Sequence, residues 1–232
     1  MAWIRYLLYF VAITFITWAL TQMEIASPGS LKLHVLLSGG DQFGSSEFSP
    51  VEIIQDIILG TCGAVMWWVA RYCPSQRPIA VPLGGVALAY LIRELDSFLD
   101  HFIVGNLRQV IIVVIAALLI VYILRNRRRL QIALARIWPS PGLTLLFAGA
   151  VIVFAFVRLV GDEVLWMALL DDDYRKVIKL AVEEFIELLG YFLWMIGTIE
   201  YAFQARAIVM AEPKPAAQRR RDKRRHDAEG RF

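Results

Sequence analysis

Near the middle of the chain the sequence reads Tyr90-Leu-Ile-Arg-Glu-Leu-Asp-Ser-Phe-Leu-Asp-His101, so an arginine, three acids and a histidine follow a long apolar run. On a helix, residues three, four and seven positions apart share a face. The polar residues therefore form two neighbouring stripes, with Arg93, Asp96 and Asp100 on one and Glu94, Ser97 and His101 on the other. A charge at the centre of a membrane-spanning helix costs about 2.5–3.5 kcal/mol on insertion scales. We therefore expect other parts of the chain to bury, pair or neutralise these groups.

The whole chain is too apolar for a soluble domain. Of its 232 residues 58% are hydrophobic, and the mean hydropathy is +0.57. The apolar residues occur in long blocks, which is typical of a polytopic helical membrane protein. We expect one all-α transmembrane domain over residues 1–210, followed by a basic, disordered cytoplasmic tail over 211–232. Its spans, about six in number, are expected near residues 3–23, 50–70, 82–102, 109–124, 143–159 and 177–203.

Local signals refine these helices. Ser49-Pro-Val-Glu52 has the residues of a capping box with proline in the first turn. The first apolar segment is long and aromatic-rich, so we interpret it as an uncleaved span rather than a signal peptide. Apolar residues at helical spacing within the basic segment 125–138 predict a separate helix on the membrane surface. Segment 161–176 is expected to be a short interfacial piece.

Basic residues indicate the orientation. They gather in four places that fall on one side of the membrane if the chain crosses it six times: Arg5, the Arg71–Arg77 turn, the Arg125–Arg136 segment and the Arg219–Arg225 tail. By the positive-inside rule that side, with both termini, is cytoplasmic. We expect a bacterial-type inner membrane, contact of the basic segments with anionic lipid headgroups, and no nucleic-acid partner.

This topology predicts that titratable residues from several helices meet in one layer beneath the periplasmic surface. The candidate ligands or proton carriers are Glu94, Asp96, Asp100, Glu183, Glu184 and Glu187. Arg93 and Arg158 are the counter-ions expected to set the pKa values of these acids, and Asp56 and His101 are expected at the rim. Neighbouring carboxylates repel strongly in a low dielectric. The acids must therefore be protonated in part, paired with arginine, or bound to a cation.

Other polar and aromatic residues have simpler interpretations. Tyr191, Trp194 and Tyr201 recur at helical spacing and are expected in the core or in an interfacial belt. Glu200 and Arg206 are expected to form an interfacial ion pair. Cys62 and Cys73 would lie about 16 Å apart on one helix, too far for a disulfide.

Three functions fit this pattern. The first is binding of a cation or exchange of protons, for transport or sensing. The second is a metal-assisted hydrolase or transferase acting on lipid, with a divalent cation held by Glu94, His101, Glu183 and Glu187. Only one of these four ligands, His101, would bind through nitrogen, and the sequence lacks the Glu-x-x-His pair of helical di-metal sites. Both points weigh against a metal site. The third is a structural role, in which ion pairs only lock the helices together. The sequence contains no nucleotide-binding loop, nucleophile elbow or haem motif that would decide whether the protein is an enzyme.

Overall fold

The structure is a computed structural model that describes residues 2–31, 35–36, 43–44, 49–95, 107–171 and 176–211. This part of the chain is helical apart from two short antiparallel strands, β1 (Val35–Leu36) and β2 (Phe43–Gly44). The helices are α1 (Ala2–Ala26), α2 (Pro50–Tyr72), α3 (Arg77–Glu94), α5 (Leu107–Ile137), α6 (Pro141–Val151), the π-helix η1 (Ile152–Phe156), α7 (Val157–Val160), α8 (Glu163–Leu170) and α9 (Lys176–Ala211).

Four helical stretches in the described residues are long and apolar enough to cross a membrane: Trp3–Ala26, Pro50–Tyr72, Gln109–Ile137 and Pro141–Val160. The last of these joins α6, η1 and α7. The chain therefore has the helical, membrane-spanning character that its composition predicts. α3 and α9 are absent from this group, and both carry charged residues.

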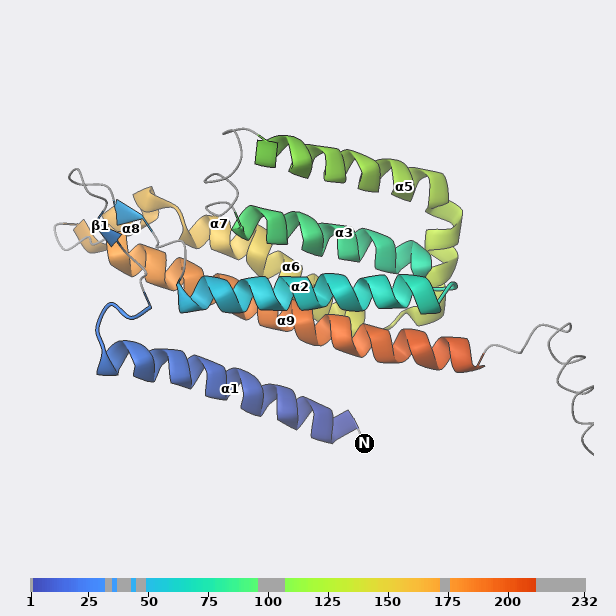
Figure 1. The fold of residues 1–232 in the computed structure, drawn as a ribbon, viewed down its shortest axis with the longest axis horizontal. Coiled ribbons are helices and arrows are strands. Elements are labelled where there is room, and N and C mark those ends of the chain that lie inside the picture. Colours follow the sequence, from blue (N-terminus) through green and yellow to red (C-terminus); the bar gives the residue numbers. More distant parts are fainter. Residues whose placement is uncertain are drawn as a thin grey trace, which may run out of the picture.

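The long helices run alternately in opposite directions (Figure 1). α9 lies at the centre and packs against α2 and α6, whereas α1 lies at the edge of the bundle. Gln55 of α2 contacts Glu184 of α9, and Tyr201 of α9 contacts Gln76 just beyond the end of α2, so these two helices are parallel. α3 is antiparallel to α9, because Glu94 at its end lies beside Tyr191.

The structure bears out some local expectations and corrects others. The capping box is confirmed: Glu52 N donates to Ser49 Oγ over 3.0 Å, and Ser49 N donates to Glu52 Oε2 over 3.4 Å. The third helix begins at Arg77 rather than residue 82, with Pro82 inside it. Pro82 lies beyond the first turn, so α3 lacks one helix hydrogen bond, to the carbonyl of Pro78. Both cysteines are free, in agreement with their spacing.

The expectation of a separate surface helix over 125–138 is wrong, because α5 continues without a break to Ile137. Its later part does turn sharply away from the first (Figure 1). Ala133 and Ile137 are buried in this later part, whereas Arg127, Arg128 and Arg129 are exposed. The amphipathic pattern is therefore real, but its apolar face packs on the bundle rather than forming an independent element.

Glycines set the contact between α6 and α9. Gly142 and Gly149 of α6 face Gly197 and Gly190 of α9, and the two glycines of each helix are seven positions apart. A Cβ added at Gly142 would lie 2.5 Å from the backbone nitrogen of Tyr201, and one at Gly197 would lie 2.6 Å from the backbone nitrogen of Leu146. Small residues allow helix backbones in lipid to approach this closely, and the gain in packing holds them together.

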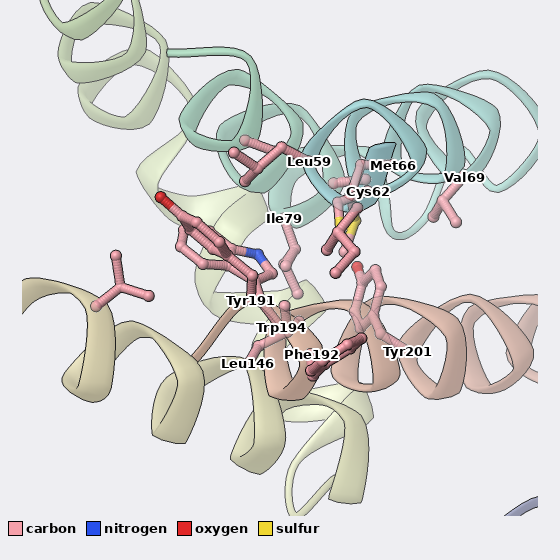
Figure 2. Close-up of a cluster of buried hydrophobic side chains, with 14 of the residues drawn as sticks. Leu59, Cys62, Met66, Val69, Ile79, Leu146, Tyr191, Phe192, Trp194 and Tyr201 are labelled. Carbon is pink, nitrogen blue, oxygen red and sulfur yellow. The ribbon is translucent and has the colours of Figure 1, made fainter. Parts of the chain in front are cut away.

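The adjoining face of α9 carries the largest buried side chains (Figure 2). Tyr191, Trp194 and Tyr201 are all buried, as expected for core residues. They face Leu59, Cys62, Met66 and Val69 of α2 and Ile79 of α3. α9 therefore packs on α6 by backbone contact and on α2 and α3 by large side chains from the adjoining face.

The glycine contact can be tested with Gly149→Ala. The new Cβ would lie 2.7 Å from the carbonyl oxygen of Gly190, which is helix backbone and cannot move aside locally, so α6 and α9 must separate. Overpacking of this kind costs about 1–3 kcal/mol. We expect a lower midpoint in thermal unfolding of the detergent-solubilised protein.

Gly60→Ala is the matched control, because a Cβ at this helical glycine of α2 meets nothing in the described structure within 4 Å beyond its own helix. It should be neutral, or stabilising by up to about 1 kcal/mol through helix propensity. Equal loss of stability in both variants would contradict the proposed role of the glycine contact.

Candidate functional site

Two acids, one arginine and one tyrosine meet between the end of α3 and the middle of α9. Arg93 Nε donates to Glu94 Oε1 over 2.9 Å, and Arg93 Nη2 also contacts Glu187 Oε1. The hydroxyl oxygen of Tyr191 lies 2.8 Å from Glu94 Oε1 and 3.0 Å from Glu187 Oε1. We call these four residues the acid cluster, and the two carboxyl groups of Glu94 and Glu187 the acid pair.

The acid cluster has more acid than base. The Glu94 and Glu187 side chains are 12% and 8% exposed, so solvent screens their charges weakly. If both are ionised, the single guanidinium leaves one negative charge uncompensated. The Tyr191 hydroxyl has one proton and can donate to only one of the two carboxylates. Two carboxylates that converge on the same two donors favour a state in which one further positive charge is held between them.

Aromatic rings hold the arginine in place. The guanidinium of Arg93 lies over the ring of Tyr90, 4.8 Å from its centroid. The Tyr90 ring packs edge-on against Phe154, with centroids 5.0 Å apart, and it also contacts Trp194 at 6.1 Å. Phe154 belongs to the π-helix η1, a form of helix that often occurs at functional sites. These rings exclude water from one side of the ion pair, which strengthens it.

Glu184 lies beside the acid cluster, on the side of α2. Nε2 of Gln55 lies 3.3 Å from Glu184 Oε2 and 3.4 Å from the backbone oxygen of Glu184. Glu52, Glu94 and Glu187 are close enough for their charges to act on Glu184. Asp56 is half-buried, and its Oδ1 is buried with no hydrogen-bond partner among the described residues.

Two predicted members of the site lie apart from the acid pair. Glu183 Oε2 lies 3.7 Å from Lys179 Nζ, and Glu183 Oε1 lies where a Cβ on Gly161 would meet it. Arg158 is exposed, and no ion pair joins it to an acid in the described part of the chain. Its charge does reach the hydroxyl of Tyr90. Asp96, Asp100 and His101 lie outside the described residues.

The structure gives no arrangement for a metal centre in the residues it describes: no group of three or more His, Cys, Asp or Glu side chains is placed to hold an ion. Of the four residues predicted as metal ligands, Glu94 and Glu187 lie together and Glu183 points elsewhere. His101 is outside the described range.

A second cluster of the same residue types lies farther along α9. Arg5 Nε and Nη2 donate to the two carboxylate oxygens of Glu200 over 2.8 and 2.9 Å, and the Tyr9 hydroxyl donates to Glu200 Oε1 over 3.0 Å. The expected Glu200–Arg206 pair is therefore wrong. Glu200 is buried, and the α1 arginine reaches it with both donors, the strongest arginine–carboxylate geometry.

The two clusters differ in charge. Arg5, Tyr9 and Glu200 contain one acid and one base, and we call them the neutral cluster. Arg5 counts toward the orientation of the chain, and it also lies four residues before Tyr9, so the two share a face of α1. An arginine and a tyrosine on one face of an otherwise apolar helix indicate that an acid of another helix is buried against them, as Glu200 is here.

Comparison with known proteins does not identify the chain. No protein-family model matches it, and no curated protein or solved structure shows significant similarity to it.

Removing the arginine of the acid cluster should strongly destabilise the protein. Arg93→Met leaves the two buried carboxyls without a cation, and breaking a buried ion pair in this way costs about 3–5 kcal/mol. We expect a large drop in the unfolding midpoint and partial recovery in the double variant Arg93→Met/Glu187→Gln. Thermal unfolding in detergent measures both.

Arg5→Met provides the comparison. The Arg5 side chain is 38% exposed against 28% for Arg93, and its loss strands one acid rather than two. We expect the smaller loss of stability in this variant. A loss from Arg5→Met as large as that from Arg93→Met would contradict the assignment of an uncompensated acid to the acid cluster.

Proposed function

We propose that this is a multi-pass membrane protein that takes up and releases a proton at the acid pair, in support of transport or sensing. A single observation carries the proposal: Glu94 Oε1 and Glu187 Oε1 both converge on the Tyr191 hydroxyl and on Arg93 Nη2. One guanidinium cannot neutralise two carboxylates in a weakly solvated setting. One added proton makes the cluster neutral, so its protonation state has two nearly balanced forms.

The proposed topology has six spans, with α3 and α9 crossing the membrane in addition to the four apolar stretches. The alternating course of the helices supports it (Figure 1). The start of α1, the turn after α2, the later part of α5 and the end of α9 lie toward one end of the bundle. The basic residues of these segments make that end cytoplasmic, and the acid cluster then lies in the periplasmic half of a bacterial-type inner membrane. Exposed arginines of α5 would contact anionic headgroups there.

A small monovalent cation is the second candidate for the same site. The acid pair, the Tyr191 hydroxyl oxygen and the Gln55 side-chain oxygen offer only oxygen ligands, which suit hard cations. A proton is favoured because Glu94 Oε1 and Glu187 Oε1 already share close donors. That arrangement leaves little room for the several ligands that a metal ion needs.

The proton-exchange proposal predicts a carboxyl signal that depends on the acid pair. Infrared difference spectra of the protein in lipid, recorded across a pH step, should contain a band from one protonated carboxyl. Glu94→Gln and Glu187→Gln should each remove or shift it, because one remaining acid against one arginine stays ionised. Glu200→Gln should leave it unchanged, because the neutral cluster has no surplus acid.

Glu200→Gln is a matched control, since Glu200 is also a buried acid of α9 that contacts an arginine and a tyrosine. If the wild-type protein lacks a carboxyl band, or if all three variants retain it, the proposal fails and the purely structural role gains support.

Chelation distinguishes proton exchange from the metal-dependent alternative. Metal-assisted hydrolysis of lipid requires a bound ion that activates water. We expect the carboxyl signal to persist after treatment with a chelator, with no stoichiometric divalent metal in the purified protein by elemental analysis. A stoichiometric metal whose removal abolishes the signal would favour the lipid hydrolase or transferase instead.

A further inference from the structure

Six buried side-chain nitrogen and oxygen atoms in the described part of the chain have no hydrogen-bond partner. They are Gln55 Oε1, Asp56 Oδ1, Ser75 Oγ, Gln76 Nε2, Trp194 Nε1 and Thr198 Oγ1. Native structures satisfy most such atoms, with protein groups or with ordered water, so each exception calls for an explanation. These six come from three places only: the start of α2, the turn after α2, and one face of α9.

The α9 members belong to a continuous polar stripe. Glu187, Tyr191, Trp194, Thr198 and Tyr201 follow one another at spacings of four, three, four and three, which places them on one face of the helix. All five residues are buried, with exposures from 0% to 6%. A heptad-spaced stripe on a membrane helix is normally apolar, so this face has an unusual number of hydrogen-bonding groups.

The stripe links the acid cluster to the opposite end of the bundle. Its outer end is the acid pair, beside which Glu184 contacts Gln55 of α2. Its inner end is Tyr201, whose hydroxyl lies 3.3 Å from both the backbone oxygen and Oε1 of Gln76. Gln76 belongs to the turn between α2 and α3, as does Ser75, and this turn is flanked by arginines.

The length of the stripe is a large part of a membrane. From Glu187 to Tyr201 it covers 14 helical steps, or about 21 Å at 1.5 Å per residue. The hydrocarbon core is about 30 Å thick. Glu187 and Tyr191 are joined directly, because the Tyr191 hydroxyl lies 3.0 Å from Glu187 Oε1. The members from Tyr191 to Tyr201 follow at about 4.5–6 Å along the axis, and one bridging water at each of these steps would connect their polar atoms.

We infer that a file of water molecules lies along this face of α9 and conducts protons between the acid pair and the Ser75–Gln76 turn. The inference rests on the proposed function and extends it, because the acid pair would then pass protons across the membrane rather than only bind them. Bridging waters would satisfy the unpartnered Trp194 and Gln76 atoms, and also Thr198 Oγ1, which otherwise has only the Cys62 thiol beside it. Leu59, Met66 and Val69 of α2 form the apolar wall beside the file.

The proton balance of this path is simple. An O–H bond of the protonated acid pair breaks, its proton joins the first water, and each water passes a different proton to the next. The hydroxyls of Thr198 and Tyr201 can accept one proton and release another, whereas Trp194 only donates a hydrogen bond that orients water. The last water, beside the Ser75–Gln76 turn, releases a proton to water on the cytoplasmic side, and the acid pair regains one from the periplasmic side. No electrons are transferred, and no co-reactant is needed.

The test is proton movement in proteoliposomes of neutral and anionic phospholipid, with an imposed pH gradient and a pH-sensitive dye trapped inside. Thr198→Val and Tyr201→Phe each remove one hydroxyl with little change of shape. We expect each to lower the rate of proton movement at least tenfold. The infrared carboxyl signal of the acid pair should remain as in the wild-type protein, since neither residue belongs to the acid cluster.

Thr61→Val and Tyr72→Phe are the matched controls. Both residues lie on α2 and are exposed, and the Thr61 hydroxyl donates to the carbonyl of Ile57 in its own helix over 2.7 Å. The controls should conduct as the wild-type protein does. Wild-type rates in Thr198→Val and Tyr201→Phe would overturn the inference, as would a carboxyl signal without any proton movement in the wild-type protein. Absence of the carboxyl signal itself would instead overturn the proposed function.

Hydroxyl-radical footprinting keeps the inference testable if a variant fails to fold. Radicals formed from bound water oxidise adjacent side chains even when these are buried. We expect labelling of Cys62 and Met66, which are 0% and 1% exposed, above that of buried Phe192 at 2%. Since sulfur is intrinsically reactive, the comparison is made after unfolding, which sets the full reactivity of each residue. Equal protection of all three would overturn the inference.

Discussion

The close contact between α6 and α9 is the constraint from which the arrangement of the bundle follows. Lipid provides no hydrophobic driving force between helices, so their association depends on close packing and on polar contacts. The glycine pairs 142/149 and 190/197 bring the two backbones together, and any side chain there would force them apart. Because α9 turns its glycine face to α6, the remaining face must meet α2 and α3. The rotation of α9 is thereby set, and with it the direction in which Glu187, Tyr191 and Thr198 project.

That rotation explains why polar groups can be buried so far inside. A carboxylate facing lipid has no partner and is expensive, whereas one facing α3 can meet an arginine. Arg93 is placed at the end of α3, where Tyr90 and Phe154 support its guanidinium. The glycine contact and the ion pairs therefore depend on each other. The glycine contact orients α9, and the ion pairs offset the free-energy cost of burying its carboxylates in that orientation.

The sequence predicts the depth of the titratable residues in the membrane, but it does not predict which arginine pairs with which acid. Periodicity and the positive-inside count bring Glu94 and Glu187 to a similar depth. Which arginine they contact depends on helix rotation, and a charge count assigns Arg93 and Arg158 the same role although only Arg93 touches the acids. The sequence does contain a signal for the contact between α6 and α9: glycines seven positions apart in each helix, at 142 and 149 and at 190 and 197. Asp96, Asp100 and His101 lie outside the described residues.

The two Glu–Arg–Tyr clusters on α9 separate structural from functional use of buried charge. With one acid, as at Glu200, the arginine and tyrosine satisfy the carboxylate fully, and the group is a lock between α1 and α9. The acid cluster has one carboxyl more than this set. When both Glu94 and Glu187 are ionised, the cluster has a net negative charge, and it is neutral only when one of them is protonated. Nothing in helix packing requires that extra acid, because Arg93 with Glu187 alone would join α3 to α9. A purely structural cluster would be more stable without it. The surplus carboxyl is therefore the feature on which we base the proposal of proton exchange.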